Sequence, residues 1–173
     1  AEEWADLFLS KVEKLRKLDF LSYHSEEELT RLVLSIKKTC FSPGKTILRQ
    51  GQKGEALYII RSGTVEVWAE TPQGRKRLAG LAEGENFGEV SILTGDICNA
   101  SVTAEGEVEL FALPPDEVRE VVKANPVLAE KMADAISKRK GVRALGLAPA
   151  AVSSSRLLDS IKSFLGLDYR HDA

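Results

Sequence analysis

Cysteine, histidine and long apolar runs are scarce in this sequence of 173 residues. Its 2 Cys are too few for a disulfide framework, and no stretch approaches the roughly 20 apolar residues that a helix needs to cross a bilayer. No signal peptide opens the chain, so we expect a reducing, cytosolic compartment. The first residue is Ala and the only Met is Met132, so we also expect these residues to be a piece of a longer protein.

Excess charge is lacking too, since 24 Lys and Arg nearly balance 26 Asp and Glu. The formal net charge of −2 provides no overall basic field for nucleic acid. The basic runs Arg75–Arg77 and Lys138–Lys140 indicate a solvated hairpin turn and a helix end, respectively, and neither indicates a DNA-binding surface. The distribution is uneven, because residues 79–118 contain 9 acids and no Lys or Arg. An anion bound by this segment would meet a negative neighbourhood.

Apolar residues recur at helical spacing at both ends of the chain. The pattern predicts a helix over residues 2–17 and a second one that starts at Ser25, whose hydroxyl can cap the free amides. After Pro114-Pro115 two further helices are expected, and the second of them has Pro126 at its first position and ends near Lys140.

The last residues indicate a linker followed by a short amphipathic helix. Residues 146–155 contain the Ala-Pro-Ala run and three serines that are typical of a linker. From Ser155 to about Gly166, a stripe of Leu, Ile and Phe predicts a helix that is too short to be stable alone. It must therefore pack on this domain, on a partner, or on its own copy in an oligomer.

Between these helical ends the apolar period falls to two and glycine punctuates the chain. Short β-rich runs with turn signals between them indicate a β-sandwich or barrel. The expected strands are 56–60, 64–69, 77–81, 100–104 and 108–113. Alternation in the second of these predicts that Trp68 lies on the outer face with the glutamates. Cys40, between a helix end and Phe41, is most simply a core residue.

Three glycine-containing segments together resemble the cyclic nucleotide-binding domain, a family that includes the bacterial catabolite activator, kinase regulatory subunits and cyclic nucleotide-gated channels. They are residues 41–44 (FSPG), 51–63 (GQKGEALYIIRSG) and 87–93 (FGEVSIL), and the resemblance spans about residues 20–140. It implies an α+β fold, in which an eight-stranded jelly-roll-like β-roll is flanked by N-terminal and C-terminal helices. It also implies a short helix in the phosphate-binding cassette and two helices after the barrel that move on ligand binding.

The physical properties of the cassette favour a phosphate seat at the start of a short helix, about Glu89 to Leu93. Free amides of a first helical turn carry partial positive charge, and Gly88 lets a ligand approach the backbone. In the family the glutamate that matches Glu89 holds the ribose 2′-hydroxyl; the alternative is a solvated acid that merely favours the helix N-terminus. The resemblance implies the following site residues: Phe87, Gly88, Glu89, Val90, Cys98, Asn99, Ala100 and Ser101.

One departure from the family pattern changes the expected ligand affinity. The family's cassette ends Pro-Arg-x-Ala-Thr/Ser-Val, and its arginine neutralises the cyclic phosphate by a bidentate contact. Residues 97–102 read Ile-Cys-Asn-Ala-Ser-Val, so Cys98 occupies the arginine position. Removing one partner of a buried charge pair costs roughly 2–5 kcal/mol. We therefore expect weak or absent binding of cAMP and cGMP by a regulatory domain of this type.

Catalysis and metal binding are not expected. Cupins share a similar β-roll but need several metal ligands, and only His24 and His171 are available here. No Ser/His/Asp set or phosphate loop can be assembled. Cys98 itself has two interpretations: a functional thiol whose pKa is lowered by a nearby helix N-terminus, or a small residue that lines a vacated pocket.

The resemblance divides the chain into a connector helix (1–19), the cyclic nucleotide-binding-like domain (20–140), a linker (141–155), and an amphipathic helix with a tail (156–173). The closing pattern resembles the C-terminal end of bacterial membrane proteins that join a mechanosensitive-type channel to this domain. That resemblance implies an upstream channel, a homo-oligomeric parent and a position at the cytosolic face of a membrane. The alternative is a stand-alone cytosolic scaffold domain with a degenerate nucleotide site.

Overall fold

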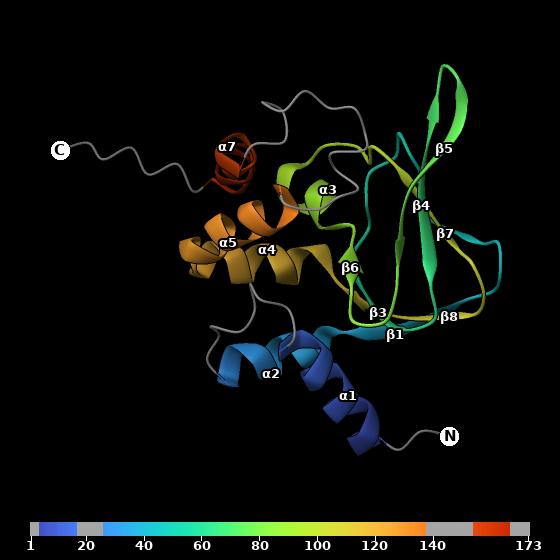
Figure 1. Cartoon of the computed structure of the whole chain (residues 1–173). Helices are drawn as coiled ribbons and strands as arrows, with labels where there is room; N and C mark the ends of the chain where they lie inside the picture. The colour runs from blue at the N-terminus through green and yellow to red at the C-terminus, as the bar shows by residue number, and fades with distance from the viewer. Residues whose placement is uncertain (1–3, 17–25, 138–153, 167–173) are drawn as a thin grey trace.

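The computed structural model describes residues 4–16, 26–137 and 154–166. The described chain runs from helices through strands back to helices (Figure 1). Its helices are α1 (Trp4–Arg16), α2 (Glu26–Ser35), α3 (Glu89–Thr94), α4 (Pro115–Ala124), α5 (Pro126–Ser137) and α7 (Ser154–Leu165). Its strands are β1 (Lys37–Phe41), β2 (Thr46–Leu48), β3 (Leu57–Ser62), β4 (Val65–Thr71), β5 (Gly74–Leu81), β6 (Asn86–Phe87), β7 (Ser101–Ala104) and β8 (Val108–Leu113).

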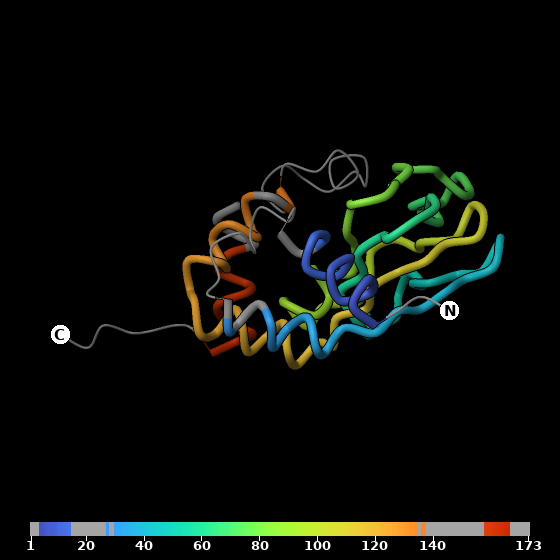
Figure 2. The backbone as a smooth tube through the Cα atoms, turned by 90° about the horizontal axis from the view of Figure 1, so that it is seen from below, coloured from blue at the N-terminus to red at the C-terminus, as the bar shows by residue number. Residues whose placement is uncertain are grey.

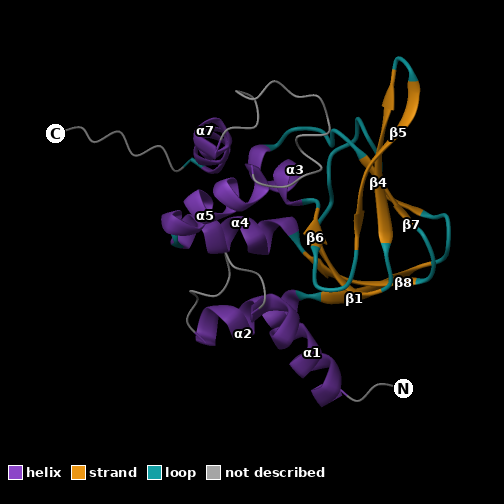
Figure 3. Ribbon diagram, viewed as in Figure 1, coloured by secondary structure: helices purple, strands orange, loops and turns teal. Residues whose placement is uncertain are grey.

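The eight strands of the described chain form two four-stranded sheets with the orders β1-β8-β3-β6 and β2-β7-β4-β5. Every pairing between neighbouring strands is antiparallel. The helices gather on one side of these sheets, away from the hairpin of β4 and β5 (Figure 3). The arrangement confirms the predicted α+β class, an eight-stranded β-roll with helices before and after it.

Strands β3 and β8 are buried on both faces, because they separate two hydrophobic clusters. Ile59 and Phe111 belong to the cluster that the helices cover, whereas Ile60 and Leu110 belong to the cluster inside the roll. All four side chains have an exposed fraction of 0%. A single strand layer therefore connects the helical side of the molecule to the roll interior.

The predicted helices are confirmed, with small shifts of their ends. The first spans Trp4–Arg16, and Pro115 and Pro126 each begin a helix, as expected from the absence of a free amide in proline. Five named features lie outside the described residues: the Ser25 cap, His24, the run 138–140, the linker up to residue 153, and His171.

Five of the strands match the expected runs, but the sequence pattern missed β1, β2 and β6. β2 and β6 contain 3 and 2 residues, which is too short for a period to be recognised. β1 is an edge strand that pairs only with β8, and its polar residues show no clear alternation. The prediction that Cys40 is a core residue is wrong, because its side chain is exposed on this edge strand.

The terminal helix α7 packs on this domain, along α5 and across α3. This finding decides among the alternatives that its amphipathic stripe left open. Ile161 and Leu165 are buried in the same cluster as the residues of α4 and α5, with exposed fractions of 0% and 6%. Ile161 and Leu165 are therefore buried by contacts within one chain.

The opposite side of the helical layer carries α1 and α2, which lie nearest to the viewer when the molecule is seen from below (Figure 2). Lys14 of α1 is buried, with an exposed fraction of 6%, and its ammonium pairs with the Glu83 carboxylate in the loop before β6. The Lys11 ammonium donates to the Ile36 carbonyl at 2.7 Å. These two contacts attach α1 to the roll.

Candidate functional site

The first part of the candidate site is the junction of β6 and α3. Gly88 is the N-cap of α3 and has φ +91°, a conformation that glycine adopts without strain. A Cβ atom at this position would lie 2.6 Å from the Ala56 carbonyl oxygen, so glycine is required by the close approach of the chain before β3. The α3 helix begins at Glu89, as predicted.

Glu89 is a buried residue of the first turn of α3, with an exposed fraction of 1%. The interpretation of this residue as a solvated acid is therefore wrong. Beside it, Phe87 is buried and stacks on Tyr58, with 5.2 Å between the ring centroids. Val90 is half-buried. Burying a carboxylate among apolar side chains is unfavourable unless the carboxylate accepts hydrogen bonds. Buried ionisable groups of this kind are common at binding sites.

The second part of the site is the segment after α3, which lies against the loop between β2 and β3. The Cys98 amide donates to the Gln52 carbonyl at 2.8 Å, and the Gly51 amide donates to the Cys98 carbonyl at 2.8 Å. The Ser101 hydroxyl accepts a hydrogen bond from the Gln50 amide at 2.9 Å. These bonds fix the backbone of the cassette end at Cys98 and Ser101.

The predicted site residues of this segment differ in exposure. Ser101 is buried, Cys98 and Ala100 are half-buried, and Asn99 is exposed. Cys98 packs against the hydrophobic cluster inside the roll.

Ser91 connects the two parts of the site, and the sequence analysis missed it. Its hydroxyl accepts a hydrogen bond from the Gly54 amide at 2.8 Å and donates to the Asp96 carbonyl at 2.6 Å. The side chain is buried, with an exposed fraction of 7%. One hydroxyl thus joins α3, the β2–β3 loop and the cassette end. Glycine at position 54 is the sequence feature that could have indicated this contact, because any Cβ there would lie 3.1 Å from the Ser91 Cβ.

The surroundings of Cys98 disfavour the charged form of its thiol. Burial raises the pKa of Cys98 above its usual value, and a hydrogen bond with Ser91 offsets only part of this effect. The hypothesis that a helix N-terminus lowers the pKa of this thiol is wrong, because desolvation dominates. The position predicted to match the family's arginine therefore has no cationic side chain, and its thiol is not favoured in the charged form.

The charges around the cassette also differ from those that the sequence suggested. Of the 9 acids in residues 79–118, five make ion pairs, four of them with cations from other elements and Asp116 with a cation of its own helix. They are Glu83 with Lys14, Glu105 with Arg77, Glu109 with Lys38 and Arg61, Asp116 with Arg119, and Glu117 with Arg31. In addition, the exposed Lys53 forms a β-bridge with Ile97, so a lysine that is distant in sequence lies next to the cassette end.

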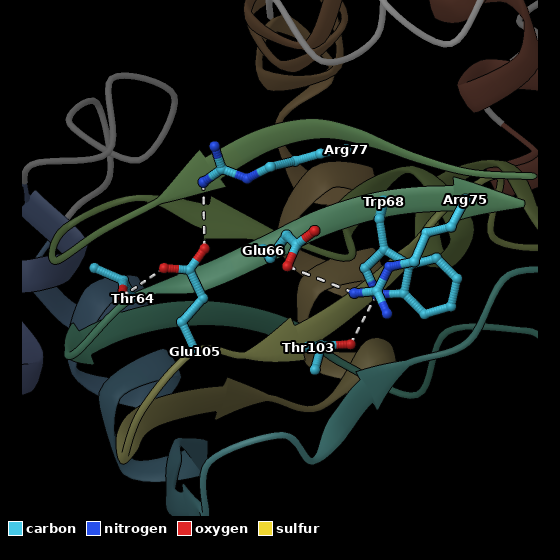
Figure 4. Close-up of polar contacts among 7 residues, drawn as sticks. All are labelled: Thr64, Glu66, Trp68, Arg75, Arg77, Thr103 and Glu105. Carbon is cyan, nitrogen blue, oxygen red and sulfur yellow. Dashed lines mark hydrogen bonds and ion pairs between the residues drawn. The ribbon is translucent and has the colours of Figure 1, made fainter.

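The outer face of β4, β5 and β7 has a polar network of its own (Figure 4). The Trp68 indole donates to the Thr103 hydroxyl at 2.8 Å, and the Arg75 guanidinium lies 3.9 Å from the centroid of the Trp68 ring. Arg75 also pairs with Glu66 at 3.5 Å. The prediction that Trp68 shares the outer face with a glutamate is confirmed, and the Arg75 cation is already engaged on that face.

Two kinds of feature are absent from the residues that the structure describes. No described helix combines the length and apolar character required to span a bilayer. No group of three or more His, Cys, Asp and Glu side chains among them has a geometry that could hold a metal ion.

A sequence profile of the cyclic nucleotide-binding domain matches residues 38–125, which include β1 from its second residue, β2 to β8 and the whole of α4. The cone photoreceptor cyclic nucleotide-gated channel subunit alpha of Gallus gallus is 36% identical over 104 residues, which are 57% of this chain and 14% of the channel subunit. The cyclic AMP receptor protein of Thermus thermophilus is 32% identical over 114 residues, 65% of this chain and 53% of the receptor.

A solved structure resembles the chain more extensively. The regulatory subunit of a cAMP-independent protein kinase A from Trypanosoma cruzi, bound to guanosine, is 25% identical with a TM-score of 0.69. The match covers 83% of this chain and 50% of that subunit. These proteins are a channel, a receptor and a kinase regulatory subunit, all longer than this chain. The sequence match over the whole roll and the shared fold lead to one conclusion: the chain belongs to the cyclic nucleotide-binding domain family.

Proposed function

We propose that this chain is the non-catalytic regulatory sensor domain of a larger protein, and that it binds cAMP and cGMP weakly or not at all. The observation that carries the proposal is the neutral, half-buried Cys98 thiol at the position of the family's phosphate-binding arginine. Loss of a charge-assisted contact of this kind costs roughly 2–5 kcal/mol, which lowers affinity by about thirtyfold to several thousandfold.

The rest of the cassette supports a binding role rather than a purely structural one. The buried Glu89 can accept hydrogen bonds from ribose hydroxyls, and the first-turn amides of α3 can donate to a polar ligand. Gly88, Phe87 and Val90 form this end of the proposed site, and Cys98, Asn99, Ala100 and Ser101 form the other. Since Gln50 already donates to the Ser101 oxygen, that hydroxyl can still donate its own proton to a ligand.

Calorimetric titration with cAMP and cGMP tests this proposal. We expect dissociation constants of tens of micromolar or weaker for both nucleotides, because no arginine compensates the phosphate charge. Low-micromolar binding of either nucleotide by the unaltered chain would show that another group, such as Lys53, neutralises the phosphate. A Lys53→Ala variant would then identify that group by its loss of affinity.

An upstream membrane channel is the parent protein that we propose, assembled as a homo-oligomer with this domain at the cytosolic face of the membrane. Two observations support it: the chain matches only 14% of a channel subunit, and α1 is attached to the roll by a buried Lys14, as a connector would be. The rival is a stand-alone scaffold domain. The reading frame of the parent gene separates them, because a hydrophobic segment upstream of Ala1 supports the channel and a start codon immediately before Ala1 refutes it.

A ligand without a phosphate group is a second candidate for the same site. The Trypanosoma cruzi subunit was solved with guanosine, a nucleoside that carries no phosphate. Because Cys98 supplies no positive charge, the site has no cation at that position to favour a ligand with a phosphate group. Titration with guanosine and adenosine beside cAMP and cGMP tests this candidate. A nucleoside that binds at least as tightly as its cyclic nucleotide supports it, whereas binding of cyclic nucleotides alone refutes it.

A further inference from the structure

The C-terminal helix α7 contacts the cassette helix directly. Its inner face buries Ile161 and Leu165 in the cluster formed by α2, α4 and α5, and Leu158 packs against the same cluster. On its other side, the Phe164 ring lies on Gly95, the residue that ends α3. A Cβ atom at Gly95 would overlap the Phe164 ring, so the two elements meet as closely as packing allows.

Arg119 of α4 completes this junction. Its Nε donates to the Ile92 carbonyl of α3 at 2.8 Å, and its guanidinium carbon lies 5.4 Å from the centroid of the Phe164 ring. Its Nη1 also bonds the Asp116 carboxylate at 3.3 Å, which fixes the guanidinium on α4. One side chain thus links α3, α4 and α7, although α7 begins only at Ser154, well after the end of α4 at Ala124.

Helix α3 depends on these contacts for its order. It has 6 residues, and helices much shorter than about 12 residues are not stable by themselves in water. Its N-terminal residues are held by the Ser91 hydrogen bonds, whereas its C-terminal turn is held by Arg119 and Phe164. If Phe164 leaves, the last turn of α3 loses its apolar cover and the ring that lies beside Arg119.

We propose that α7 is a built-in regulatory segment, which docks on Gly95 and Arg119 and thereby holds α3 in the conformation that the candidate ligand site requires. The effect on ligand rests on the proposed function of that site. Because docked α7 orders α3 in advance, a ligand that needs an ordered α3 binds more tightly when α7 is docked. Linkage requires the converse, so the same ligand stabilises docked α7. The C-terminus of the domain can thus report on the cassette.

Hydrogen exchange on the full chain without ligand tests the structural half of the proposal. The variant is Phe164→Ala, which removes the contact with Gly95 and Arg119 but leaves the core intact, since Phe164 is 46% exposed. We expect amides of residues 89–95 to exchange about tenfold faster, through local opening, while β3 is unchanged. The control is Ser163→Ala, an exposed neighbour on the same helix, which leaves α3 unchanged. Equal exchange of α3 in the Phe164→Ala variant and the unaltered chain overturns the proposal.

A second measurement tests the coupling to ligand. With a saturating concentration of guanosine or cAMP, whichever gives the larger heat, amides of residues 158–165 should exchange more slowly, and Phe164→Ala should weaken binding by about fivefold. Unchanged exchange of α7 with ligand bound overturns the coupling. If neither compound binds the unaltered chain, the same comparison is made with cAMP in a Cys98→Arg background. A failure of the proposed function therefore appears as low-micromolar binding of a cyclic nucleotide by the unaltered chain, whereas a failure of the α7 proposal appears as unchanged exchange in α3.

Discussion

Replacement of Cys98 by arginine is the sharpest test of the candidate site. Cys98 lies at the cassette end, where the bonds to Gly51 and Gln52 fix its backbone. Because these bonds involve only main-chain atoms, the backbone geometry survives a change of side chain. The Cys98→Arg variant should therefore introduce a guanidinium at the position of the family's arginine without rebuilding the loop.

The expected gain follows from the surroundings of Cys98. A bidentate contact between arginine and phosphate in a fully buried site is worth roughly 2–5 kcal/mol. Cys98 is half-buried, so solvent screens part of this interaction and the lower end of the range applies. A gain of at least about 1.4 kcal/mol corresponds to a tenfold or greater increase in affinity for cAMP or cGMP.

Isothermal titration calorimetry at two salt concentrations measures this gain. The matched control is Cys40→Arg, because it changes the net charge by the same amount on an exposed edge strand. A general electrostatic effect would raise affinity in both variants, whereas a specific phosphate contact raises it only at Cys98. A Cys98→Gln variant separates the charge of arginine from its size.

Two results would refute the reasoning. Unchanged affinity in a folded Cys98→Arg variant would mean that Cys98 does not match the arginine position or that α3 and its surroundings hold no phosphate. An equal gain in Cys40→Arg would mean that overall charge, and not a contact at the cassette, limits binding.

Three further predictions concern stability and reactivity. The Gly88→Ala variant should lose roughly 2–5 kcal/mol of unfolding free energy by urea titration, since backbone strain adds to a clash. The Gly84→Ala variant, at a position with φ +87° and open space, should lose only the part of the unfolding free energy that is due to strain. Equal losses in the two variants would contradict this account. Burial raises the pKa of the Cys98 thiol, so its alkylation, measured by mass spectrometry, should accelerate only at a higher pH than that of an ordinary cysteine. The exposed Cys40 should react first, and the reverse order would contradict this prediction. Trp68→Phe should cost about 1–2 kcal/mol through the lost indole hydrogen bond and weaker cation–π contact, and an unchanged urea midpoint would refute that contribution.

The sequence was sufficient to predict the fold because its signals were local. Glycine spacing and short apolar runs indicated the roll, and proline at positions 115 and 126 marked the starts of α4 and α5. Strand β6 was not predicted, because its two residues are too few to show a period. This strand is defined only by its pairing with β3. Cys40 was assigned to the core because an apolar neighbour suggested burial, whereas its position on an edge strand depends on the whole sheet order.

The candidate site was less accessible from sequence because its parts come from distant segments. Nothing local in the sequence indicates that the β2–β3 loop bonds to the cassette end, or that Ser91 joins both to α3. The docking of α7 was open for the same reason, since an amphipathic stripe identifies a packing face without its partner. The cassette residues, Cys98 among them, could be predicted directly, because the family pattern has a fixed spacing.

The charge around the cassette is the property that differs most between the sequence and the folded chain. Over residues 79–118 the sequence counts 9 acids and no base, which suggests a strongly negative cassette. Four of these acids pair with cations from other elements, so adjacency in sequence overstates the repulsion that a phosphate would meet. On the proposed function, the affinity for a cyclic nucleotide is limited by the missing contact at Cys98 rather than by the local field. Added salt should accordingly change the affinity of the unaltered chain little, because screening weakens a diffuse field but cannot replace a bidentate contact.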